Sequence, residues 1–192
     1  MTASMPTPSI MLADTDNPQA LFPPDAELAN LPGVWRVAHV KARQEKALAR
    51  DLARSSVAYY LPMYEVRRTS RGRSWRATLP LFPGYVFFCG SEDDRLGALK
   101  TSRVAKIIDV SDQQRLIGEL TAIRRLTESG MSVDPYPSLT TGRRCRVRSG
   151  PLRGVEGAVA RRKGATRFVV EVSILGQGAA VEINGDLLEP VD

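Results

Sequence analysis

The residues best suited to chemistry in this sequence are two groups of basic side chains, one of which contains a tryptophan. The first group lies near residues 41–46, and the second lies within Arg67 to Thr78 (RRTSRGRSWRAT), which has five arginines and no acid. Basic side chains bind phosphates, and an indole can stack on an unpaired base. The candidates for nucleic-acid binding are therefore Lys41, Arg43, Lys46, Arg71, Arg73, Trp75, Arg76 and Arg103. The alternative for the second group is a solvated loop.

Residues for catalysis or metal binding are sparse. His39 is the only histidine, and Cys89 and Cys145 have no CxxC spacing. The densest acidic run, Glu92-Asp93-Asp94, is explained by the start of a helix. No nucleophile–base order, metal-ligand spacing or phosphate-binding loop is present. We therefore predict a protein that is not an enzyme and has no cofactor or metal, with both cysteines as reduced, small apolar residues.

The segment Pro80–Phe88 (PLFPGYVFF) concentrates aromatic residues beside a predicted turn at Pro83-Gly84. Strand alternation places Phe87 and Phe88 on opposite faces, and an interior position is as open for them as an exposed one. Phe82 and Tyr85 flank the turn, and we expect them to form a partly exposed apolar patch of the kind that binds partners. The predicted partner-binding residues are Phe82, Pro83, Gly84 and Tyr85.

The elements that would position these residues form an α+β domain at residues 34–110. Its antiparallel sheet and flanking helices follow from apolar periodicity and turn residues. We expect a strand at 34–40, a helix at 43–54, a β-prone run at 57–66, a hairpin tip at 67–78, a strand at 79–88, a helix at 92–99 and a strand at 104–110.

The remaining chain is predicted to comprise a tail, a connector and a small barrel. Residues 1–33 contain six prolines and read as a flexible tail in which only Leu21 and Phe22 could dock. Residues 111–138 read as a helix capped by Ser111 and Gln114, followed by a linker at 131–138. Residues 139–192 hold short strands and glycine turns, which indicate an all-β barrel. The strands are expected at 145–147, 155–160, 168–174 and 180–183.

Charge and hydropathy set the protein's environment. The net charge is +6, and residues 34–110 carry fifteen of the 27 bases against seven acids. Such a surplus suggests a polyanionic neighbour. The sequence has no membrane-length apolar run and no secretory start, so we expect a cytoplasmic protein without membrane contact.

Two motifs resemble known ones. The order WRVAHVKARQEKALARDL, PLFPGYVFF and IIDV resembles the N-terminal (NGN) domain of the NusG family of transcription factors. Arg146–Val159 (RVRSGPLRGVEGAV) resembles a KOW motif, so the resemblance implies an SH3-like KOW barrel after the NGN domain. PLFPGY, KARQEK and SDQQRLIGEL are similar to specialised relatives such as RfaH.

The resemblance also implies partners and a function. It implies an elongation and antitermination factor that binds the clamp helices of the largest RNA polymerase subunit and suppresses pausing or termination. Its first basic group would lie beside non-template DNA in the transcription bubble, where Gln44 is a candidate to read a base. Its KOW domain would recruit ribosomal protein S10 or Rho through Ile174, Leu175 and Gly176. The expected protein is a bacterial monomer in the cytoplasm, associated with the nucleoid through polymerase. The alternatives are a ribosome-associated or RNA-binding KOW protein without polymerase contact and, for Leu175, a cover over the barrel end.

Overall fold

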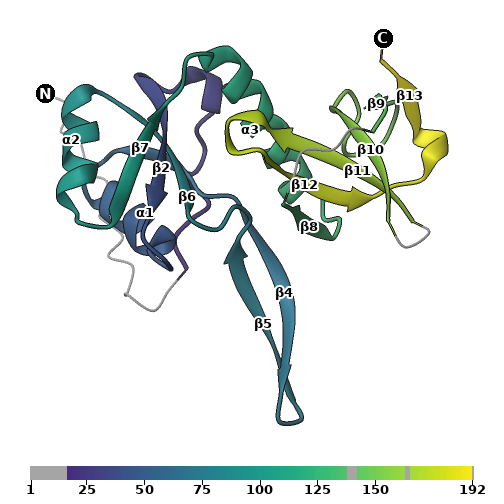
Figure 1. Cartoon of the computed structure of the whole chain (residues 1–192), viewed down its shortest axis with the longest axis horizontal. Coiled ribbons are helices and arrows are strands. Elements are labelled where there is room, and N and C mark those ends of the chain that lie inside the picture. The colour runs from purple at the N-terminus through teal and green to yellow at the C-terminus, as the bar shows by residue number, and fades with distance from the viewer. Residues whose placement is uncertain (1–16, 138–141, 163–164, 192) are drawn as a thin grey trace, which may run out of the picture.

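The computed structural model describes residues 17–137, 142–162 and 165–191 of the chain. It contains two bodies built on antiparallel sheets, with the long helix α3 (Gln113–Glu128) lying between them (Figure 1). A third, two-stranded sheet projects from the first body. The α+β class predicted for the first part and the all-β class predicted for the second are both confirmed.

The first body is a five-stranded sheet covered on both faces by helices. One face packs on α1 (Glu45–Arg54) and α2 (Glu92–Lys100), and the other packs on α3. The strand order is β1 (Leu21–Phe22), β3 (Ala58–Tyr60), β6 (Tyr85–Gly90), β2 (Val34–Val40) and β7 (Val104–Asp109).

The central strands β2 and β6 are apolar on both faces because both faces are covered. Val37 and Phe87 lie in the core beneath α3, whereas Ala38 and Phe88 lie in the core beneath α1. Phe87 and Phe88 are both fully buried. The prediction that they lie on opposite faces is confirmed, and both faces are interior.

The helix starts are set by side-chain caps. Ser91 caps α2 in a reciprocal capping box with Asp94, and the acidic run lies in the first turn of this helix, as expected. The cap of α3 is Asp112, whose carboxylate accepts a hydrogen bond from the Arg115 amide at 3.0 Å, so the prediction of Ser111 is wrong by one residue. Aspartate can make this bond as well as serine, and the sequence has both in succession.

The N-terminal segment differs from the expected tail over its described part. Residues 1–16 lie outside the described residues, but β1 pairs with β3, and a 3-10 turn at Leu28–Asn30 contacts α3. Leu21 and Leu28 are buried. Their burial holds residues 17–33 to the first body, despite the prolines.

The second body is a six-stranded antiparallel sheet that fits a KOW-type barrel. Its interior contains Phe168, Val170 and Val181. The strand order is β13 (Leu188–Pro190), β9 (Arg144–Val147), β10 (Glu156–Arg162), β11 (Ala165–Val172), β12 (Gln177–Glu182) and β8 (Val133–Tyr136).

Strand β8 arises from residues expected to be a linker. Val133 pairs with Val181 and is 8% exposed, so a short apolar residue draws the segment onto the sheet edge. Pro135 is compatible with this position because an edge strand does not need every amide. The connector therefore ends close to Gly130, and the chain enters the second sheet at once.

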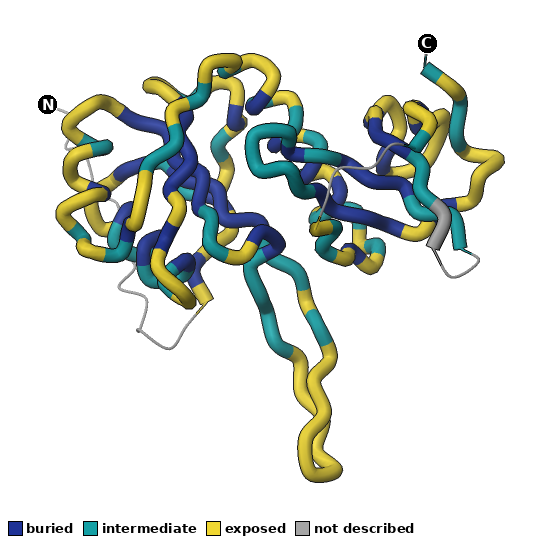
Figure 2. The backbone as a smooth tube through the Cα atoms, in the orientation of Figure 1, coloured by how far each residue is buried: buried dark blue, intermediate teal, exposed yellow. Residues whose placement is uncertain are grey.

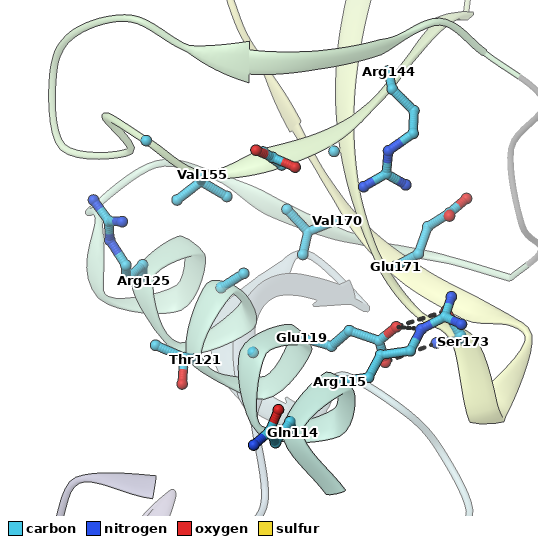
Figure 3. A pocket seen from close by; sticks show the side chains of 15 residues that line it. Gln114, Arg115, Glu119, Thr121, Arg125, Arg144, Val155, Val170, Glu171 and Ser173 are labelled. Atoms are coloured by element: carbon cyan, nitrogen blue, oxygen red, sulfur yellow. Dashed lines mark hydrogen bonds and ion pairs between the residues drawn. The ribbon is translucent and has the colours of Figure 1, made fainter. Parts of the chain in front are cut away.

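The two bodies are docked through α3. Leu116, Leu120 and Ile123 belong to one continuous core with Val170 and Val172 of the barrel. At the edge of this contact, a cleft of about 390 Å³ is lined by α3 on one side and by β10 and β11 on the other (Figure 3). The docking brings side chains from distant parts of the sequence into direct contact.

Candidate functional site

The Pro83-Gly84 turn is held rigidly by the first strand and the first helix. Gly84 has a φ of +88°, a region that favours glycine. Its amide donates to the Glu45 carboxylate at 2.7 Å, and its carbonyl accepts from the Val40 amide at 2.8 Å. Glu45 is buried, so the first residue of α1 fixes the turn from within.

Phe82 points inward from this turn, which corrects the expectation of an exposed side chain. It is 1% exposed and packs edge-on against Phe87, with ring centroids 6.0 Å apart. The chain enters the turn from the α3 side of the sheet, where the apolar core takes up the ring. Phe82 therefore supports the turn and does not present a surface.

The exposed part of this site is an aromatic patch of His39, Pro83 and Tyr85. His39 and Pro83 are exposed and Tyr85 is half-buried. The His39 and Tyr85 rings stack with centroids 5.1 Å apart and planes inclined by 28°. Lys106 on β7 pairs with His39 and borders the patch.

Sequence reasoning did not assign His39 or Lys106 to a site. The available signal was strand alternation, which places His39 on the same face as Trp35 and Val37. Those two residues are covered by α3, whereas His39 lies where the cover ends. A polar residue at the end of an apolar face marks that boundary.

The first basic group is partly neutralised by the fold. The Lys46 ammonium donates to the Thr78 carbonyl and to the Asn17 amide oxygen, each at 2.6 Å. Its pKa is lowered chiefly by burial and further by Arg50. Lys46 thus anchors the base of the hairpin to α1.

Gln44 and Arg103 are likewise bound to each other. The Arg103 guanidinium donates to the Gln44 side-chain oxygen at 2.6 Å and forms an ion pair with Asp51. Lys41 and Arg43 are exposed, and within the described part of the chain neither side chain has an ion pair. They are the members of this group whose charges face solvent unpaired.

The second basic group lies on the predicted hairpin. Strands β4 (Met63–Ser70) and β5 (Arg73–Pro80) pair over their full length and project from the first body, with an exposed tip (Figure 2). Arg71 and Gly72 form a two-residue loop with φ values of 50° and 77°, as a type I′ hairpin turn requires. All of the hairpin arginines and Trp75 are exposed.

The structure brings some of the predicted sites together and separates others. The aromatic patch adjoins the first basic group, because Lys41 follows His39 and Val40 in the chain. The Lys41 amide donates to the Arg103 carbonyl, which brings Arg103 to the same place. The hairpin tip lies away from both. The predicted rim, Ile174 to Gly176, is half-buried and overlaps the 3-10 turn Ser173–Leu175 that contacts α3.

The described residues contain neither a candidate metal site nor a membrane-spanning helix. Among them, no cluster of histidine, cysteine and carboxylate side chains could hold a metal ion. No helix among them is long and apolar enough to cross a membrane.

The comparisons with known proteins identify the first body. A family model described as NusG, transcription termination factor nusG, matches residues 33–126. The match extends from β2 to most of α3, and it identifies a transcription-associated factor. A search of curated proteins finds no match.

Proposed function

We propose that this chain, whose residues 33–126 belong to the NusG family, binds RNA polymerase through the aromatic patch and acts as an elongation and antitermination factor. The observation that carries the proposal is the stack of the exposed His39 on the half-buried Tyr85, beside a turn fixed by Glu45. An exposed aromatic pair on a rigid support gains affinity without a large ordering cost.

The mechanism is mechanical and electrostatic. The aromatic patch would dock on the clamp helices of the largest polymerase subunit, and Lys41 and Arg43 would lie against non-template DNA. Bridging the two sides of the DNA channel holds the clamp closed, which suppresses pausing or termination. Lys46, Gln44 and Arg103 act in this scheme by positioning, because their side chains already bind within the protein.

The second body would recruit a partner through Ile174, Leu175 and Gly176. Gly176 has a φ of +63° and ends the 3-10 turn, so the turn presents two apolar side chains in succession. Ribosomal protein S10 or Rho would bind there. Ser173 in the same turn is hydrogen-bonded to Glu119 of α3, so a partner would have to bind next to the contact between the barrel and α3.

Capture of RNA polymerase by the tagged chain tests the proposal. Tyr85→Ala should lower polymerase retention about tenfold or more, as expected for loss of an aromatic anchor. Leu96→Ala is the matched control, because Leu96 is an apolar residue on α2 with 42% exposure and lies outside the patch. Unchanged retention for Tyr85→Ala, in a variant that stays folded, would contradict the proposal.

A further inference from the structure

The pairing register divides the hairpin into two chemically different faces. Residues directly opposite each other share a face of a two-stranded sheet, as do residues two apart on one strand. Arg68 pairs with Trp75, and Arg73 lies two residues before Trp75. Arg67 pairs with Arg76 on the opposite face. One face thus carries two arginines with an indole, and the other carries two arginines alone.

The hydrogen bonds of the arginines differ in the same way. On the face without the indole, Arg67 donates to the Ser74 hydroxyl at 3.0 Å, and Arg76 forms an ion pair with Glu65 at 3.4 Å. On the indole face, Arg68 and Arg73 have no ion pair within the part of the chain that the structure describes. Their guanidinium groups are therefore available to an external anion.

Trp75 is half-exposed on this face, at 50% of its full accessible surface. The apolar surface of an indole in such a position is removed from water only when a ligand covers it. A phosphate alone would satisfy the arginines and leave the indole uncovered. A nucleotide in a single strand supplies both a phosphate and an unstacked base.

We propose that the Arg68–Arg73–Trp75 face of the hairpin binds single-stranded nucleic acid, with Trp75 stacked on a base and the two guanidinium groups on flanking phosphates. This inference deepens the nucleic-acid part of the proposed function, but it concerns the free chain and needs no polymerase. The base must be unpaired, because the bases of a duplex are already stacked on their neighbours.

The two tryptophans provide a direct optical test. Trp35 is 2% exposed, and its indole donates to the Leu28 carbonyl, so added ligands do not reach it. Quenching of tryptophan emission by a nucleic acid therefore reports on Trp75. We would titrate the full chain with oligothymidylate and with oligouridylate of about 12 nucleotides, and with a DNA duplex of equal length.

Both single strands should quench the exposed emission, and the ratio of their affinities tells whether DNA or RNA is preferred. Trp75→Ala should raise the Kd for the single strand about tenfold, measured by anisotropy of a labelled strand. A duplex that binds more tightly than the single strands, or saturating strand binding without quenching, would overturn the proposal.

Two double variants with the same net charge separate the faces. Arg68→Gln with Arg73→Gln should reduce the salt slope by about 1.4, as loss of two single-strand phosphate contacts requires. Arg67→Gln with Arg76→Gln should leave both the slope and the quenching nearly unchanged. Equal losses in the two variants would show that only total charge matters and would overturn the assignment of a face. Polymerase capture by the same variants reports separately on the aromatic patch.

Discussion

Phe82 and Tyr85 flank the same turn, yet their environments assign them different roles. Phe82 is fully buried against Phe87, so Phe82→Ala should lower the free energy of unfolding by about 3–5 kcal/mol. Tyr85 is half-buried, and its truncation should cost about 1 kcal/mol or less. Urea denaturation of the isolated chain would measure both values. Equal stability losses in the two variants would contradict this division.

At the scale of single residues, the sequence predicted the turn, but it did not predict which side chains beside the turn are exposed. The Pro83-Gly84 pair located the turn, and strand alternation placed Phe87 and Phe88 on opposite faces. Alternation within a strand does not extend through a turn, so it could not show which way Phe82 points. Likewise, the charges of Lys46 and Arg103 were visible in the sequence, but their partners Thr78 and Asp51 are distant along the chain.

The capping box at the start of α2 gives this element a pH-dependent stability. The Ser91 amide and hydroxyl both donate to the Asp94 carboxylate at 2.8 Å, and these bonds hold the pKa of Asp94 below its ordinary value of 3.8. A lowered pKa contributes stability that is complete above the ordinary value and is lost as pH falls through the folded-state pKa.

Asp94→Asn should therefore lower the melting temperature near pH 7, with a stability loss of about 0.5–1 kcal/mol. The difference from the unmodified protein should shrink as the pH falls below 3.8 and vanish below the folded-state pKa of Asp94. Asp93→Asn is the control, because Asp93 lies in the same first turn but outside the capping box. A loss that persists at low pH would mean that the carboxylate charge is not the cause.

Among the elements, those with strong local patterns were predicted closely and those fixed by distant pairing were not. The helix expected after Ser111 is α3, because its apolar residues recur at helical spacing. The strand β8 and the short β1 lack such a pattern, since each is only one edge of a sheet whose other strands lie far away in sequence. The pairing of an edge strand depends on residues that are distant in the sequence, so a local sequence pattern does not predict it.

At the scale of the whole molecule, the docking of the barrel on α3 was not evident from the sequence. Glu119 is the polar centre of the contact, because its carboxylate accepts hydrogen bonds from the Ser173 amide at 3.1 Å and hydroxyl at 2.6 Å. Arg115 donates to both Glu119 and Ser173 (Figure 3). Arg125 reaches the Arg153 carbonyl of the barrel at 2.6 Å. The docking thus engages the 3-10 turn that contains Leu175.

Glu119→Ala should weaken this docking by about 1–3 kcal/mol, because it leaves the polar groups of Ser173 without their acceptor. Glu128→Ala is a matched control: both glutamates lie on α3 and pair with an arginine four residues earlier, but Glu128 is paired within the helix alone. Amide nitrogen relaxation would give the rotational correlation times of the two bodies separately. They should agree in the unmodified protein and in Glu128→Ala, and the barrel should tumble faster in Glu119→Ala. A common correlation time in all three proteins would show that the apolar contact of Leu116 and Leu120 with Val170 is sufficient to hold the barrel.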